Sequence, residues 1–266
     1  MRFKLTIEYA GTRYSGWQIQ KNAKTVQGEI ERAIKAATDQ NEFELYGSGR
    51  TDAGVHALAQ VAHLDIRSTM PPETLRRRIN DELPADINVL RVEKVRHSFH
   101  ARHAAIGRTY LYQISRRRTA FAKAYVWWVK EDLDLARMRS AASRFVGFHD
   151  FRTFSDADPR EGSTEVLLEV LDVSEAGDLI VVRVDGSHFI WKLVRRLVGV
   201  LVEVGRGRLS AEDAAALLTS ASPLPARLTA PAAGLFLAAV RYKGDDTLEL
   251  AYGLTLLGGV PPLNRR

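Results

Sequence analysis

The chain has 266 residues, enough for one large domain or two modest ones with buried cores. Apolar residues make up 45% and charged residues 26%, which is typical of a globular protein. The absence of cysteine excludes disulfides, thiolate metal sites and cysteine nucleophiles, and it is consistent with a reducing cytoplasm. Charged residues interrupt the longest apolar stretch, 189–204, so it cannot span a bilayer, and the alternating N-terminus indicates a strand rather than a signal peptide.

Basic residues exceed acidic ones, 38 against 32, which gives a net charge of +6. An excess of this size favours a polyanionic partner only weakly, because any one basic cluster is usually a solvated surface. The basic residues do gather in clusters of one sign, however, and this makes a nucleic acid a reasonable candidate partner. These clusters are Arg76–Arg78, Arg116–Arg118, Arg195–Arg196, and Arg206 with Arg208.

Hydrophobic spacing in the first half predicts the order β-α-β-β-α-β. Alternating apolar residues predict strands, and apolar residues three or four apart predict helices. This is the order of a ferredoxin-like unit, and we assign residues 1–106 to it. Strands are expected at 3–9, 43–46, 57–66 and 87–95, with helices at 26–37 and 71–83.

The second half, residues 107–266, repeats that order without a visible sequence repeat. We therefore predict an α+β fold of two similar ferredoxin-like halves with mainly antiparallel sheets, and a site in the cleft at their junction. The turn Glu175–Asp178 predicts a hairpin. Strands are expected at 109–115, 166–173, 179–184 and 235–242, and helices at 135–145, 189–204 and 211–218.

The loop GSGRTDAGVH (47–56) combines glycines, a cation and a carboxylate between two strands. Its simplest interpretation is a turn, since Asp and Gly favour turns for backbone reasons. A carboxylate site on a rigid scaffold is a close second. A phosphate cradle is disfavoured, because the lysine motif GxxxxGK[ST] is absent and a strand follows instead of a helix.

On a helical wheel of 189–204, Arg195 falls at the edge of the apolar arc. Its guanidinium either extends outward along its stem or pairs with a buried carboxylate, and the wheel favours neither. Lys192, Arg196 and Glu203 fall on the opposite side, where a solvated face is expected.

Tyr110 and Tyr112 point to one side of their predicted strand. Core packing is the usual explanation for such a pair, and a stacking platform for bases is the functional alternative. The nearby histidines His97, His100 and His103 match no known metal-ligand spacing, so no metal site is predicted.

Seven segments, in order along the chain, resemble the TruA-type tRNA pseudouridine synthases. The most specific of them contains GRTDAGVH. The segments are IEYAGTRYSGWQ (7–18), TVQGEIERAI (25–34), GRTDAGVHALAQVAHLD (49–65), SFHARHAAIGRTYLY (98–112), FVGFHDFRTF (145–154), VRRLVGVLVEVG (194–205) and APAAGLFLAAVRY (230–242).

This resemblance implies an isomerase that converts uridine to pseudouridine at positions 38 to 40 of the tRNA anticodon stem-loop. Asp52 matches the catalytic aspartate, and Arg195 matches the basic residue that pairs with it. Tyr110 matches the tyrosine that stacks on the target base and can handle the C5 proton. Arg50 matches the arginine that contacts RNA, and His56 is counted with the substrate-binding residues. The resemblance also implies a homodimer that uses no metal or organic cofactor. Together with the lack of cysteine and of a bilayer-spanning stretch, it leads us to expect a cytoplasmic protein with no membrane partner.

Two positions depart from the family pattern and bear on the choice of RNA site. GSTEVL (162–167) stands where many relatives have an arginine-containing segment, and Arg196 stands where a small polar residue is common. An alternative hypothesis is a non-catalytic RNA-binding protein of ferredoxin-like units. Against it, the chain has no RNP1-like aromatic motif. A phosphate-loop enzyme that acts on nucleotides is a third and weaker hypothesis.

Overall fold

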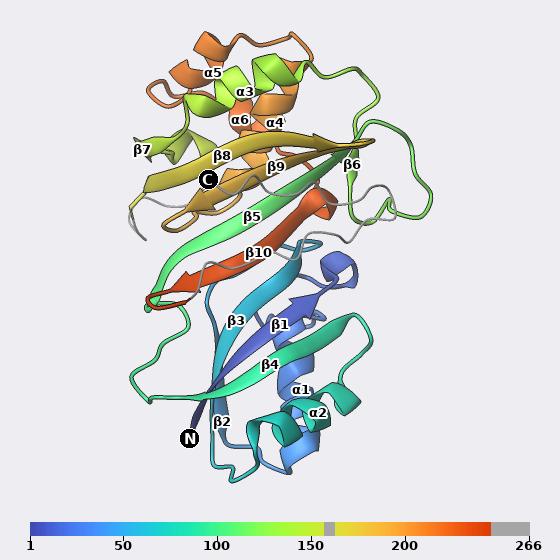
Figure 1. Ribbon diagram of the computed structural model, residues 1–266, viewed down its shortest axis with the longest axis vertical. Coiled ribbons are helices and arrows are strands. Elements are labelled where there is room, and N and C mark those ends of the chain that lie inside the picture. The colour runs from blue at the N-terminus through green and yellow to red at the C-terminus, as the bar shows by residue number, and fades with distance from the viewer. Residues whose placement is uncertain (157–162, 246–266) are drawn as a thin grey trace. The chain divides into compact units, whose positions relative to one another are not determined.

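The computed structural model describes residues 1–156 and 163–245, which form two compact units (Figure 1). Unit 1 comprises Met1–Ile106 and, of the described residues, also 236–245. Unit 2 comprises the described residues of Gly107–Leu235. Each unit contributes its own strands and helices.

Unit 1 has the predicted order β-α-β-β-α-β, with its strands in the antiparallel order β4-β1-β3-β2. Four alternate residues of β1, all predicted, are fully or almost fully buried: Phe3, Leu5, Ile7 and Tyr9. Both helices lie on one side of this sheet and contact each other (Figure 1). The elements are β1 (Arg2–Tyr9), α1 (Val26–Thr38), β2 (Phe43–Gly47), β3 (His56–Ile66), α2 (Pro72–Glu82) and β4 (Ile87–Val95).

The closing strand β10 (Leu235–Tyr242) was assigned to the second half of the chain by the sequence analysis, but most of it lies in unit 1. From Phe236 onwards it belongs to unit 1, where it pairs in parallel with the first residues of β3. Because β2 pairs only with 62–66 of β3, the start of β3 has an open edge there, and β10 fills it. This pairing places β10 beside His56 and Ala57, directly after the GRTDAG loop.

Unit 2 is built on the strand order β5-β9-β8-β7, antiparallel where pairings are described, with β6 parallel to β5. The predicted hairpin is present, with Gly177 at a φ of +57° between β8 and β9. The short strands β6 and β7 were not predicted. The strands are β5 (Ala105–Ser115), β6 (Trp127–Trp128), β7 (Gly147–Asp150), β8 (Glu165–Ala176) and β9 (Leu179–Gly186).

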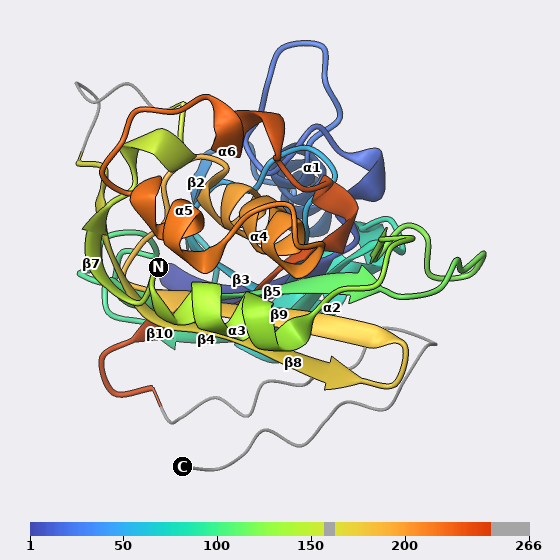
Figure 2. The same cartoon turned by 90° about the horizontal axis from the view of Figure 1, so that it is seen from above.

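The helices of unit 2 lie together on one side of β8 and β9 (Figure 2). They are α3 (Leu135–Ser143), α4 (Leu193–Gly205), α5 (Ala211–Ala216) and α6 (Leu224–Arg227), the last of which was not predicted. The prediction that the apolar helix starts at Phe189 was wrong. It starts at Leu193, because Lys192 takes a left-handed backbone with φ of +62° that interrupts helical geometry.

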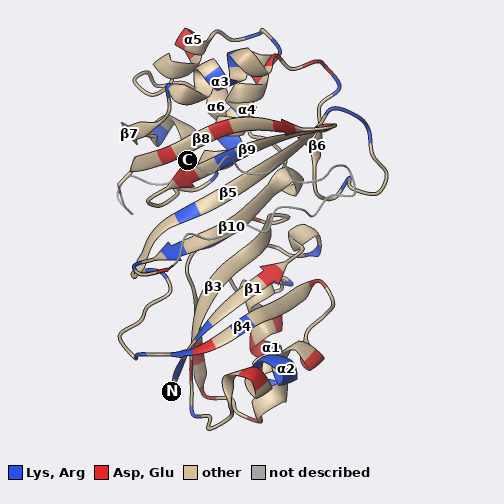
Figure 3. Ribbon diagram, viewed as in Figure 1, with Lys and Arg blue, Asp and Glu red and all other residues tan. Residues whose placement is uncertain are grey.

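Acidic residues recur along β8 (Figure 3). Glu165, Glu169 and Asp172 are all exposed. This strand therefore presents negative charge that a phosphate backbone would avoid. None of the helices in the described ranges is long and apolar enough to cross a membrane.

Candidate active site

The GRTDAG loop leaves β2 and returns as β3, and it holds its carboxylate at a half-buried position. Asp52 is half-buried and Arg50 is exposed. The turn closes through a bond from Val55 N to the Asp52 carbonyl oxygen at 3.1 Å, with Gly54 at a φ of +79°. At that φ a side chain is strained, so glycine is required there. The turn interpretation and the carboxylate interpretation are therefore compatible.

A second segment, residues 10–17, packs against this loop through its backbone. Trp17 N donates to the Thr51 carbonyl oxygen at 3.1 Å, and Gly54 N donates to the Tyr14 carbonyl oxygen at 3.3 Å. The close approach requires glycine, since a Cβ on Gly11 would overlap the carbonyl oxygen of Val55. The motif AGTRYSGW thus forms one body with the loop that carries Asp52.

His56 lies beneath this body, with only 1% of its surface exposed. Its Nδ1 accepts a hydrogen bond from Gly11 N at 3.0 Å, and its ring stacks on Phe236 of β10 at a centroid distance of 4.7 Å. The sequence analysis expected His56 among the substrate-binding residues. In the structure its ring contacts Gly11 and Phe236, and the bond from Gly11 supports the backbone next to the loop.

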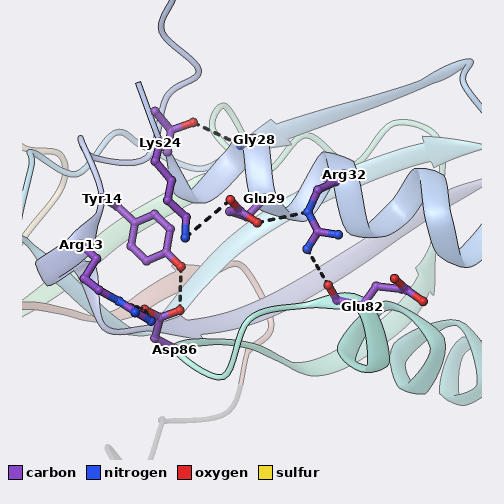
Figure 4. Close-up of polar contacts among 9 residues, drawn as sticks. Arg13, Tyr14, Lys24, Gly28, Glu29, Arg32, Glu82 and Asp86 are labelled. Carbon is purple, nitrogen blue, oxygen red and sulfur yellow. Dashed lines mark hydrogen bonds and ion pairs between the residues drawn. The ribbon is translucent and has the colours of Figure 1, made fainter. Parts of the chain in front are cut away.

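An ionic anchor holds residues 10–17 in turn (Figure 4). Tyr14 Oη donates to Asp86 Oδ1 at 2.6 Å, and Arg13 Nε donates to Asp86 Oδ2 at 2.9 Å. Burial acts to raise the pKa of Asp86, but the bonds from Tyr14 and Arg13 outweigh it and hold that pKa below its ordinary value. Burial, together with the bond to Asp86, raises the pKa of Tyr14.

The same anchor reaches both helices of unit 1 (Figure 4). Lys24 Nζ lies 5.2 Å from the centre of the Tyr14 ring and pairs with Glu29 of α1 at 3.8 Å. Glu29 accepts from Arg32 Nε at 3.2 Å, and Arg32 also donates to the Glu82 carbonyl oxygen, at the end of α2, at 2.6 Å. Sequence reasoning missed Asp86, which stands in a loop with no motif of its own. Only its place opposite Arg13 and Tyr14 reveals its part in holding the site.

In unit 2, the two tyrosines of β5 separate into different environments. Tyr112 is fully buried and its Oη donates to the Pro231 carbonyl oxygen at 2.8 Å, so the core-packing interpretation holds for it. Tyr110 is half-buried, and Phe189 meets its ring edge-on at 4.9 Å and 76°. Phe189 is a site neighbour that sequence reasoning missed, because its continuous apolar run with Ile190 and Trp191 concealed a loop.

Arg195 lies at the first turn of α4 and is half-buried. Its Nε donates to the Ala230 carbonyl oxygen at 2.7 Å, and its own carbonyl oxygen accepts from Ala230 N at 3.0 Å. Gly199 allows this contact, because a Cβ there would overlap the carbonyl oxygen of Leu228. The chain after α6 therefore fixes the stem of Arg195.

Arg196 was expected on a solvated face, and this expectation was wrong. Its side chain is only 2% exposed, and its guanidinium pairs with Asp156. The residues after β7 cover that side of α4 and bring Asp156 to it, which the wheel of an isolated helix cannot show. The bond from Arg196 holds the pKa of Asp156 below its ordinary value. Arg196 Nε has no hydrogen-bond partner among the described residues.

His100 and His103, two of the three histidines noted in the sequence, form a ring cluster with His63 and Tyr46. The centroid of His100 lies 4.7 Å from that of His63 and 4.3 Å from that of His103. Within residues 1–156 and 163–245, no three His, Cys, Asp or Glu side chains are grouped so as to hold a metal ion.

Comparison with known proteins identifies the class. The sequence profile described as tRNA pseudouridine synthase matches residues 5–103 and 141–243. These ranges include the loop that carries Asp52, and Arg195 and Arg196 of α4. The chain belongs to this family, which confirms the resemblance seen in its motifs.

Individual relatives are similar over nearly their whole length. A tRNA pseudouridine synthase A of Rhodopseudomonas palustris is 45% identical over 245 residues, which cover 91% of this chain and 99% of the relative. One of Xanthobacter autotrophicus is 45% identical over 244 residues, with 91% and 99% covered. A tRNA pseudouridine synthase A 2 of Clostridium tetani is 40% identical over 244 residues, with 90% and 98% covered.

Proposed function

We propose that this chain converts uridine to pseudouridine at positions 38 to 40 of the tRNA anticodon stem-loop, with Asp52 as the catalytic carboxylate. One observation carries the proposal: in a chain of the tRNA pseudouridine synthase family, Asp52 is half-buried in a loop that a second segment holds by backbone bonds. A catalytic group needs such fixed placement, because small displacements reduce reaction rates strongly.

The reaction is an isomerisation that needs no oxidant, reductant or external group. The N1–C1′ bond of uridine breaks, the uracil turns, C5 bonds to C1′, C5 loses its proton and N1 gains one. Asp52 serves either as a nucleophile at C1′ or as a base at C2′. In this proposal Arg195 supplies the positive charge that pairs with the carboxylate.

The target base has to leave its stack before it reacts, which costs a few kcal/mol. We assign Arg50 to the RNA contact that helps extrude the base, since Arg50 is exposed and stands two residues before Asp52 in the same loop. Tyr110 is assigned to stacking on the uracil and to the C5 proton. His56 supports the loop from beneath through Gly11.

The central experiment replaces Asp52 with alanine and measures tritium release from tRNA labelled at C5 of uridine. We expect no release above background and an unchanged melting temperature, because the carboxylate acts on the substrate. Asp81→Ala, at an exposed carboxylate of α2, is the matched control and should retain activity. Ordinary release from the Asp52 variant would end the proposal. The non-catalytic alternative predicts that even the wild-type chain binds tRNA without forming pseudouridine.

Tyr110→Phe separates the hydroxyl from the ring. If the hydroxyl transfers the C5 proton, the Kd for tRNA should stay within about twofold while kcat falls about 100-fold. The variant keeps the ring that Phe189 meets edge-on, so it changes the hydroxyl alone. Unchanged turnover would leave Tyr110 with stacking alone.

We further propose that the chain works as a homodimer in the cytoplasm, as the family resemblance implies. Its lack of cysteine suits a reducing compartment. Sedimentation equilibrium at micromolar concentration should give twice the chain mass. A single monomeric species over that range would contradict the dimer and leave the reaction untouched.

A further inference from the structure

A surface pocket of unit 1 adjoins Arg50, and the proposed chemistry does not use it. Its volume is about 350 Å³, which includes open solvent at its mouth. It lies between the end of β2, the segment after Gly16 and the turn that follows β4. The residues on which the argument depends are Trp17, Gln27, Tyr46, Arg50 and Arg102.

Tyr46 offers an aromatic surface that is already held in place. The side chain is 36% exposed, although large aromatic residues are usually more buried. His63 stacks on its ring at 5.7 Å and 24°, and His100 meets it at 4.9 Å and 64°. A ring fixed in this way loses little freedom when a flat ligand stacks on it.

Arg102 is carried by a turn that the same two histidines organise. His63 Nδ1 accepts from Ala101 N at 3.2 Å, and His100 Nδ1 accepts from Arg102 N at 3.1 Å. Both bonds require neutral imidazoles with Nδ1 unprotonated. Burial lowers the pKa of His63 to about 4 and also lowers that of His100, so the turn is preserved at neutral pH.

The inner wall of the pocket is built around Trp17 and Gln27. Trp17 is buried against Gly47, where a Cβ would lie 2.6 Å from the indole Nε1. Gln27 Nε2 donates to Glu31 Oε1 at 3.0 Å and to the Leu45 carbonyl oxygen at 3.3 Å, which fixes the orientation of the amide. Gln27 Oε1 is buried without a hydrogen-bond partner in the described part of the chain, so this wall holds an acceptor that an N–H group of a ligand would satisfy.

The positive charge of the pocket favours an anionic ligand. Its lining contains two guanidinium groups and, among the described residues, no Asp or Glu. An aromatic face beside cations and an amide acceptor matches three features of a nucleotide, which are the flat face of its base, the N–H groups on the edge of that base, and its phosphate. Because Arg50 belongs both to this pocket and to the Asp52 loop, the ligand is expected close to the reacting nucleotide.

We propose that this pocket binds a nucleotide that flanks the target uridine in the same RNA strand, with its base stacked on Tyr46 and its phosphate held by Arg50 and Arg102. This inference rests on the proposed function, since it concerns how the same tRNA is held. It assigns Tyr46 and Arg102 to substrate binding and gives them no part in the chemical step.

The test measures the Kd with which Asp52→Ala protein binds tRNA. The tRNA is assembled by ligation and carries a single abasic nucleotide, which is placed in turn at each position that flanks the target uridine. One abasic position should weaken binding about 10-fold, as the loss of one stacked base does. Tyr46→Leu, added to Asp52→Ala, should weaken the binding of intact tRNA by a similar factor. In that protein the abasic change at the same position should have no additional effect.

Controls separate this outcome from loss of folding or of function. Phe148→Leu removes an exposed aromatic side chain from β7 of unit 2 and should leave the Kd unchanged. Arg102→Gln should weaken binding and reduce its salt dependence, since one phosphate contact is lost. Thermal melting shows whether each variant is folded.

Two results would overturn the pocket assignment. One is an unchanged Kd in folded Tyr46→Leu protein. The other is that, at every position tested, the abasic change raises the Kd of the Tyr46→Leu protein by the same factor as it raises that of the protein with Tyr46. If wild-type protein forms pseudouridine in either case, only the pocket assignment fails. If wild-type protein forms none, the proposed function fails.

Discussion

The two units hold their proposed site residues by different means. In unit 1 the Asp52 loop is fixed by backbone bonds from residues 10–17, which are anchored in turn at Asp86. In unit 2 the stem of Arg195 is fixed by its own Nε on the Ala230 carbonyl oxygen, and the neighbouring Arg196 is fixed by Asp156. The site in unit 1 should therefore be sensitive to a side chain added where the two backbones meet, and that in unit 2 to the loss of single side-chain partners.

The largest effect is expected from Gly11→Ala. The new Cβ would overlap the Val55 carbonyl oxygen, so residues 10–17 have to move away from the Asp52 loop. We expect the free energy of unfolding to fall by about 3 kcal/mol, as for severe overpacking. Gly49→Ala is the control in the same loop, since its Cβ would meet nothing within 4 Å. Urea denaturation that gives equal losses for both variants would contradict the backbone account.

A pH-dependent loss of stability is expected from His63 of unit 1. Its folded pKa is lowered to about 4 against an ordinary 6.5, so between these values the unfolded chain binds the extra proton. Stability is therefore fully present above pH 6.5 and falls as the pH drops towards 4, by about 3 kcal/mol at most. His63→Gln keeps an acceptor for Ala101 N and should reduce this slope in urea denaturation curves measured between those pH values. An identical slope in the variant would assign the effect to other groups.

In unit 2, Asp156→Asn leaves the buried Arg196 guanidinium without its charge partner. Removing one partner of a buried pair is destabilising, and because Asp156 is 46% exposed we expect about 2 kcal/mol rather than more. Replacing both residues, Asp156→Asn with Arg196→Met, should recover part of this loss, since no buried charge then remains. A double variant less stable than Asp156→Asn alone would mean that Arg196 stabilises α4 through packing.

The smallest effect is expected from Tyr112→Phe, which removes one hydrogen bond to the Pro231 carbonyl oxygen. The free energy of unfolding should fall by about 1 kcal/mol while turnover stays unchanged. Comparison with Tyr110→Phe, two residues earlier on β5, then shows whether the two tyrosines differ in function as they do in burial. A fall in turnover for both variants would remove that distinction.

Element type was predictable wherever an apolar pattern was long. The alternation in β1 and the helical spacing in α1 were confirmed, because each pattern describes the one face that the element buries. Short elements such as β6, β7 and α6 bury too few residues to leave such a pattern. The start of α4 was misplaced because an apolar run carries no mark of the left-handed backbone at Lys192.

The candidate residues Asp52 and Arg50 came from one contiguous motif, so sequence could indicate them together. Arg196 shows the limit of that approach. Its burial depends on Asp156, forty residues earlier in the chain, and no wheel of α4 alone contains that partner. Asp86 and Phe189 were missed for the same reason, since each acquires its role from a distant contact.

Sequence by itself determined the family, the α+β class and the contiguous loop that carries Asp52, because these depend on local pattern and motif. Only the tertiary structure decided that residues 10–17 clasp that loop, that β10 joins the sheet of unit 1, and that Tyr46 and Arg102 meet around one pocket. Those features arise from hydrogen bonds and close packing between residues far apart in the chain, and such contacts are satisfied only when the whole unit has folded.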